Sequence, residues 1–199
     1  MATRPTEDEL LKNVSRVGNL VALMPEERQI KVQTMLAGPV GQIYYTAPAS
    51  SHEEYHSCYP GGLAQHSLNV VRNLKKIADA LCPKRYPDHQ LAFVGLFHDL
   101  GKVGDGEKES YVPNTDQFQR NRGRLYEINK ECAWMPSSER GLFILQKNGI
   151  EVTSEEYLAI RLNDGQYVRE NEPYRNREPD LALLLHWADH WSAKQEKTE

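Results

Sequence analysis

The sequence contains only three cysteines, and this scarcity excludes several kinds of chemistry. Cys58, Cys82 and Cys132 are odd in number, widely spaced and form no Cys-x-x-Cys motif. Such cysteines are typical of reduced thiols in a cytoplasmic protein, and they indicate neither a disulfide framework nor a thiolate metal site. We therefore expect a cytoplasmic chain whose chemistry depends on other residue types.

Long hydrophobic runs and an excess of basic residues are also lacking. No apolar stretch approaches the roughly 20 residues that span a bilayer, and the N-terminal segment lacks the apolar centre of a signal peptide, so no membrane partner is expected. The formal net charge of −4 disfavours a general coat for nucleic acid. A nucleotide, a small phosphoester or a short nucleic-acid end stays open as a substrate. The sequence leaves the oligomeric state open.

The strongest functional signal is a short stretch at residues 92–102, AFVGLFHDLGK. An apolar helix normally ends in chemically inert residues, whereas this one ends in His98 and Asp99, with Lys102 just beyond. Imidazole and carboxylate groups are both good ligands for a divalent metal ion. We interpret this stretch as one half of a metal centre.

Two further residues stand out because their neighbours at helical spacing are apolar. These are His66, within residues 63–81, and Asp189, within residues 181–195. Taken singly, His66 also fits a hydrogen-bonded core histidine, and Asp189 a salt-bridge partner. A buried carboxylate is costly unless it is paired or ligated, so convergence on one cation explains the set best. We predict one divalent ion (Mn, Fe, Co, Ni, Zn or Mg) with the ligands His66, His98, Asp99 and Asp189.

Helical periodicity dominates the chain and predicts an all-α fold, with no strand–helix alternation that would indicate a parallel sheet. We expect one domain over residues 1–199, with scaffold helices in 1–40, a functional core in 41–195 and a frayed polar tail in 196–199. Two segments depart from the helical pattern. Residues 41–60 are expected to form an irregular segment or a short turn of helix, and residues near 110–128 to form a small β-hairpin or flap.

Three segments, GGLAQHS, FHDLGK and LHWADHWSA, closely resemble the signature stretches of the HD-domain superfamily of metal-dependent phosphohydrolases. They occur in the order typical of that all-helical family, which is named for its His–Asp doublet. The resemblance covers residues 41–195 and implies an HD-domain helical bundle with the four ligands predicted above. In size the chain resembles bacteriophage and bacterial HD hydrolases. The segment before GGLAQHS is similar to HD-type 3′–5′ exoribonucleases and relaxase-associated HD domains.

One departure from the family bears on the number of ions. Dinuclear HD enzymes use additional histidines between the doublet and the last aspartate, but here His186 is the only histidine between Asp99 and Asp189. We therefore expect a single tightly held ion. A weakly held second Mg or Mn, bridged by Asp99 and Asp164, is left open.

Further residues are expected around the ion. Lys102 matches the family's phosphate-facing lysine, Asp164 is a candidate general base, and His56 is a candidate proton donor. The alternatives are ordinary ones: Asn-Asp-Gly is a common helix ending, and His56 also fits a surface loop. We expect substrate contacts from Lys102, Arg120, Arg124 and Tyr126, and support of the ligands by His186 and Asn163.

The resemblance implies hydrolysis of a phosphoester or phosphoanhydride in a nucleotide-type substrate through metal-activated water. A nucleotidase or a deoxynucleoside-triphosphate hydrolase fits this compact acidic chain best. A 3′–5′ exonuclease is the first alternative, although the chain has no attached nucleic-acid-binding domain. A cyclic-nucleotide phosphodiesterase is disfavoured by the missing histidines. A non-catalytic HD-fold module that binds a nucleotide or a protein is disfavoured by the intact ligand set.

Overall fold

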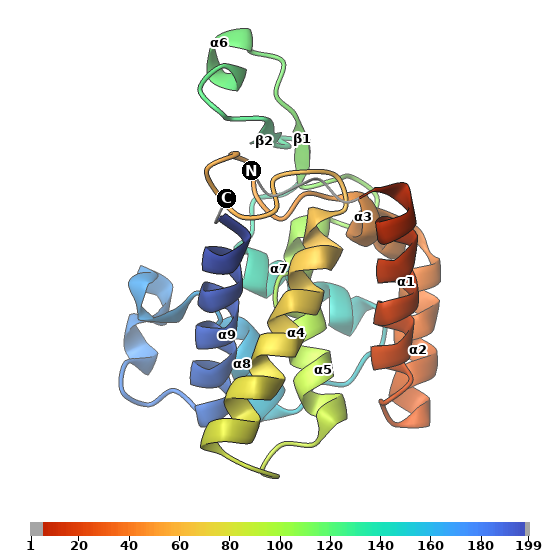
Figure 1. Ribbon diagram of the computed structural model, residues 1–199, viewed down its shortest axis with the longest axis vertical. Coiled ribbons are helices and arrows are strands. Elements are labelled where there is room, and N and C mark those ends of the chain that lie inside the picture. The colour runs from red at the N-terminus through yellow and green to blue at the C-terminus, as the bar shows by residue number, and fades with distance from the viewer. Residues whose placement is uncertain (1–5, 198–199) are drawn as a thin grey trace.

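The computed structural model describes residues 6–197 and has an all-α fold with one small antiparallel hairpin (Figure 1). The longer helices are α1 (Glu7–Val21), α2 (Glu26–Ala37), α3 (Pro39–Thr46), α4 (Gly62–Leu81), α5 (Asp88–Phe97), α7 (Ser137–Lys147), α8 (Ser154–Arg161) and α9 (Asp180–Lys197). The short elements are η1 (Leu100–Val103), β1 (Tyr111–Pro113), α6 (Gln117–Arg120), β2 (Tyr126–Ile128), η2 (Gly165–Tyr167) and η3 (Arg169–Tyr174). The predicted all-α class and the predicted hairpin are confirmed.

Capping residues in the sequence explain where two of the helices begin. Thr6 accepts a hydrogen bond from the backbone of Glu9, whose side chain bonds back to the backbone of Thr6, and α1 starts at the next residue. Thr153 and Glu156 form the same reciprocal pair at the start of α8. Each pair satisfies two backbone donors that the first helical turn would otherwise leave unpaired.

Helix α4 is the centre of the fold. It packs most extensively against α9 and α5, and it also contacts α1 and α3, so in Figure 1 it runs through the middle of the molecule. Its apolar stripe, including Leu63, Val70 and Leu74, is fully buried, and burial of each such side chain stabilises the fold by about 1.5–3 kcal/mol. The helix that contains His66 is therefore held between the two helices that lead to the other predicted ligands.

Gly95 sets the separation of α4 and α5. A Cβ atom at this position would lie only 2.7 Å from Cγ2 of Val71 on α4, a distance that packed side chains do not tolerate. The glycine thus permits a close approach of the two helices. Because His98 follows one turn later, this approach brings its ring towards α4.

Residues 41–60 contain both predicted alternatives. The short helix α3 begins at Pro39, where a proline is favoured in the first helical turn, and ends at Thr46, and an irregular segment follows it. One expectation from the sequence is wrong. The tail predicted over 196–199 is not frayed at Glu196 and Lys197, which form the last turn of α9. Residues 198–199 lie outside the described range.

The hairpin projects from the end of the helical body at which α9 finishes (Figure 1). Its strands pair in antiparallel register, with Tyr111 opposite Ile128, and α6 forms its tip. All three cysteines are free thiols, as expected. Within residues 6–197, no helix combines the length and the apolar character needed to cross a membrane.

Candidate metal centre

The four predicted ligands converge from three parts of the fold. His66 lies in the first turns of α4, His98 and Asp99 follow α5, and Asp189 lies in α9. Nε2 of His66 lies 2.9 Å from Oδ1 of Asp189 and 3.9 Å from Oδ2 of Asp99. Nε2 of His98 lies 3.4 Å from Oδ2 of Asp99 and 3.7 Å from Oδ1 of Asp189. The structure therefore brings these four side chains together.

These separations suit ligands of one ion. Two ligands at about 2.1 Å from a metal lie about 3.0 Å apart in an octahedral site and about 3.4 Å apart in a tetrahedral site. Both imidazoles are fully buried, and Nε2 of His98 has no hydrogen-bond partner among the described residues. A buried nitrogen without a partner is costly, and a cation between the four side chains removes that cost. The residues therefore fit a metal ion.

Hydrogen bonds to the second ring nitrogens fix the orientation of both imidazoles. Nδ1–H of His98 donates to the carbonyl of Gly95 over 2.9 Å. Nδ1–H of His66 donates to the carboxylate of Glu196, at 3.0 Å and 3.2 Å from its two oxygens. Each bond leaves Nε2 as the atom directed at the carboxylates, which is the arrangement that metal-binding histidines adopt.

Glu196 is the site residue that sequence reasoning missed. Its side chain is 10% exposed, and besides His66 it accepts hydrogen bonds from Nδ2 of Asn69 and Oγ of Ser57, each over 2.8 Å. A signal for it was present in the sequence. Glu196 follows Asp189 by seven residues, or two helical turns, which places both carboxylates on the same face of α9.

The charges of the site are strongly coupled in the absence of metal. Burial alone lowers the pKa of His98, but the charges of Asp99 and Asp189 outweigh it and raise that pKa to about 10. Burial alone raises the pKa of Asp189, but the hydrogen bond from His66 and the nearby charges of His98 and His66 bring it well below its usual value. The metal-free site is thus a set of imidazolium–carboxylate pairs, and a divalent cation binds by displacing their protons.

Lys102 lies beside the ligand set, as predicted. Its Nζ is 2.5 Å from Oδ2 of Asp99, and its side chain is 17% exposed. Burial opposes its charge, but Asp99 raises the pKa of Lys102 above its usual value. The lysine is therefore a charged group at the edge of the centre.

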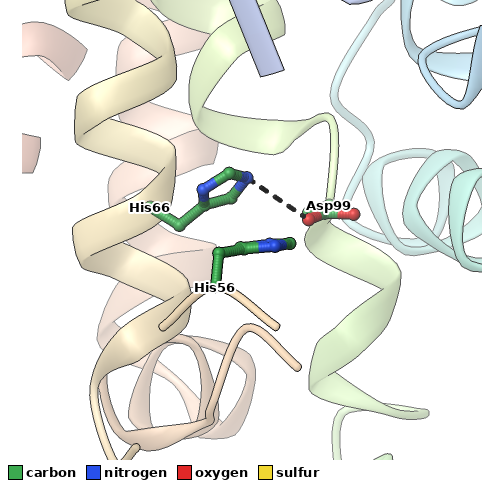
Figure 2. A group of neighbouring side chains, drawn as sticks. All are labelled: His56, His66 and Asp99. Carbon is green, nitrogen blue, oxygen red and sulfur yellow. Dashed lines mark ion pairs between the residues drawn. The ribbon is translucent and has the colours of Figure 1, made fainter. Parts of the chain in front are cut away.

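His56 extends the cluster. Its ring centroid lies 4.2 Å from that of His66, and Figure 2 shows both rings beside Asp99. One ligand atom from each of these three residues lies within 4.8 Å of the others. Nε2 of His56 is buried without a hydrogen-bond partner in the described part of the chain. Burial, together with the nearby charges of His66 and Lys102, lowers the pKa of His56 to about 3.

The turn after α8 forms another wall of the site. Asn163 is buried, and its Nδ2 lies 3.5 Å from the carbonyl of His98. Nδ1–H of His186 donates to the carbonyl of Asn163 over 2.7 Å. This hydrogen bond supports the turn, whereas the sequence predicted that His186 would support a metal ligand. Burial and the charge of Asp99 raise the pKa of Asp164. The carboxyl group of Asp164 therefore lies close enough to the ligand set to be influenced by its charges.

The two arginines predicted as substrate contacts on the hairpin are not brought to the ligand set. Arg120 ends α6 at the hairpin tip (Figure 1), Arg124 is exposed and bonds to Gln119, and Tyr126 lies in β2. A cavity of about 620 Å³ opens beside the centre instead. The residues that line it are Ala49, Ser50, Ser51, Tyr55, His56, Lys102, Tyr111, His190, Ala193, Lys194 and Lys197.

No family model, curated protein or solved structure matches this chain.

Proposed function

We propose that this chain is a metal-dependent phosphohydrolase that acts on a nucleotide-type substrate, with nucleotidase or deoxynucleoside-triphosphate hydrolase activity favoured. One observation carries the proposal: the unpartnered Nε2 of His98 faces the carboxylates of Asp99 and Asp189, next to the charged Lys102. The resemblance of three segments to the HD-domain superfamily supports the same reaction class.

The donor set favours a particular group of ions. Two imidazole nitrogens and two carboxylates form a mixed nitrogen and oxygen environment, which suits Mn, Fe, Co, Ni, Zn or Mg, and Mn is our first choice. His66, His98, Asp99 and Asp189 would hold the ion. When bound, a divalent ion supplies Lewis acidity and lowers the pKa of water to near neutrality.

Lys102 is the residue we assign to the phosphoryl group. In the free protein its ammonium group pairs with Asp99, and it also lines the 620 Å³ cavity, in which a substrate would lie. A fixed positive charge beside a phosphoryl group offsets the negative charge that builds up on its oxygens during displacement. Loss of this charge is therefore expected to reduce the rate more than the binding of substrate.

His56 and Asp164 are the candidates for proton transfer. The low pKa of His56 leaves it uncharged near neutral pH, which favours a role as a metal ligand over the proton-donor role predicted from the sequence. The raised pKa of Asp164 brings its carboxyl group closer to neutrality, a change that suits a group which takes up and releases a proton near its working pH.

A metal and substrate panel tests the proposal. Purified protein is supplied with each metal in turn and with nucleoside mono-, di- and triphosphates, cyclic nucleotides and short oligonucleotides. Phosphate, triphosphate and mononucleotide as products distinguish nucleotidase, triphosphohydrolase and exonuclease. We expect Asp99→Ala to abolish both tight metal binding and hydrolysis, while Asp79→Ala, which removes an exposed carboxylate from α4, changes neither. Full metal content and full activity in Asp99→Ala would contradict the proposal.

A further inference from the structure

Two cavities of different chemistry lie along one face of α9 and meet at His190, the neighbour of Asp189. The first, of about 350 Å³, lies between α9 and the segment around η2, and His190, Trp187 and Trp191 line it. The second is the 620 Å³ cavity beside the metal centre, which His190 also lines. A volume of about 300–1,000 Å³ is usual for small-molecule sites.

The smaller cavity is suited to an aromatic group. Trp187 and Trp191 are one helical turn apart, and they are 47% and 51% exposed, so two indole rings present themselves on one side of α9. Large aromatic side chains left this exposed mark a binding surface. Leu162 and Leu183 supply further apolar walls. Among the described residues that line the cavity, Glu178 is the only acidic one, and none is a lysine or an arginine.

The larger cavity is suited to phosphate groups. Lys102, Lys194 and Lys197 line it, and no acidic residue within 6–197 does, although the chain as a whole has a net charge of −4. Lys194 and Lys197 follow Asp189 by five and eight residues, which places them about 7.5 and 12 Å further along the axis of α9. Three lysines that line one cavity beside the ligand set can bind more than one phosphate group.

We propose that the two cavities form one bipartite nucleotide site, in which the nucleobase stacks on Trp187 and Trp191 and the phosphate chain lies along the three lysines. The inference rests on the proposed function, because it places the phosphates beside the metal centre. It names the substrate class as a nucleoside polyphosphate. A nucleotide is divided into an aromatic base and anionic phosphates, and an aromatic cavity next to a cationic one complements that division.

Tryptophan fluorescence provides a test that does not depend on catalysis. The chain has three tryptophans. Two of them line the proposed base cavity, whereas Trp134 is 84% exposed and lines a different cavity, which Lys102 also lines. The full-length protein is titrated in Mg²⁺ with a methylene-bridged nucleoside triphosphate, with the nucleoside alone and with inorganic triphosphate. We expect the first two to quench the fluorescence and the third to bind without strong quenching.

The variants separate the two halves of the site. Trp187→Leu and Trp191→Leu are each expected to weaken binding of the nucleotide by about 5- to 100-fold, the range for loss of one aromatic stacking partner, and to leave inorganic triphosphate unaffected. Lys194→Gln with Lys197→Gln is expected to weaken both phosphate-containing ligands and to leave the nucleoside unaffected. Phe143→Leu, which shortens an equally exposed aromatic side chain on α7, is the matched control and should bind all three ligands normally. Circular dichroism checks that each variant is folded.

Several outcomes would overturn the inference. Normal nucleotide binding by folded Trp187→Leu and Trp191→Leu would do so, and so would a change in oligomeric state of these variants on size-exclusion chromatography, which would make the tryptophan face a contact between chains. Failure of the proposed function gives a different result. If the nucleotide and the nucleoside quench the fluorescence but no hydrolysis is found, the proposed hydrolase function is wrong and the bipartite site stands. If hydrolysis is unchanged in both tryptophan variants, the bipartite site is wrong and the hydrolase function stands.

Discussion

Glu196 is expected to determine how tightly the site holds its metal, although it is not among the four ligands. It holds Nδ1–H of His66 at 3.0 Å and is itself fixed by Asn69 and Ser57. The negative charge makes the opposite ring nitrogen a stronger ligand and keeps the ring in one tautomer. Removal of such a partner typically costs 10- to 100-fold in metal affinity, or about 1.4–2.8 kcal/mol.

Two substitutions divide this effect into its parts. Glu196→Gln keeps an oxygen that accepts the hydrogen bond but loses the charge, so we expect a loss of about tenfold. Glu196→Ala loses both and leaves a buried N–H unpaired, so we expect about 100-fold, together with a fall in the free energy of unfolding of about 1–3 kcal/mol. Glu151→Gln removes one negative charge from an exposed position and serves as the control.

The assay is calorimetric titration of metal-free protein with Mn²⁺, with thermal unfolding measured on the same samples. A purely structural role for Glu196 would lower the stability and leave the affinity of the folded protein unchanged. Metal affinity in folded Glu196→Gln and Glu196→Ala within twofold of the original chain would refute the reasoning.

Two further predictions concern packing and pH. Gly95→Ala should lower the free energy of unfolding by about 1–3 kcal/mol, because the new methyl group meets Val71 and forces α4 and α5 apart; chemical denaturation checks this, and an unchanged stability would count against the close packing. In a chelator, the raised pKa of His98 stabilises the fold fully below about pH 6.5, and this stabilisation is lost towards pH 10. The free energy of unfolding of the metal-free protein should therefore fall by up to about 1.4 kcal/mol per pH unit between these two pH values, whereas the metal-bound protein should show no such fall. Equal stability of the metal-free protein at pH 6.5 and pH 10 would contradict this prediction.

The ligand set was predictable because its members are polar residues in apolar surroundings. His98 and Asp99 end a hydrophobic helix, and burial without a partner is too costly for either, so a shared ion was the economical explanation. The helices were predictable for a related reason, since their apolar stripes and capping residues are local signals. Convergence of α4, α5 and α9 follows from the burial of those stripes against one another.

Glu196 was not predictable in this way, because a polar side chain that is buried against other polar groups leaves no trace in hydropathy. Its neighbours in the sequence are charged or polar, and the segment was interpreted as a solvated tail. The basic residues that line the cavity were not predicted either. Arg120 and Arg124 lie among aromatic residues in the sequence, but only the direction of α9 shows that Lys194 and Lys197 point to the cavity.

A crystal structure of the protein grown with Mn²⁺ tests the metal centre most directly, through the anomalous signal of the ion. We predict one strong peak per chain, within about 2.0–2.3 Å of Nε2 of His66, Nε2 of His98 and one oxygen each of Asp99 and Asp189. A folded protein that shows no peak between these four side chains at saturating Mn²⁺, or a peak only at other residues, would contradict the metal centre and the function built on it.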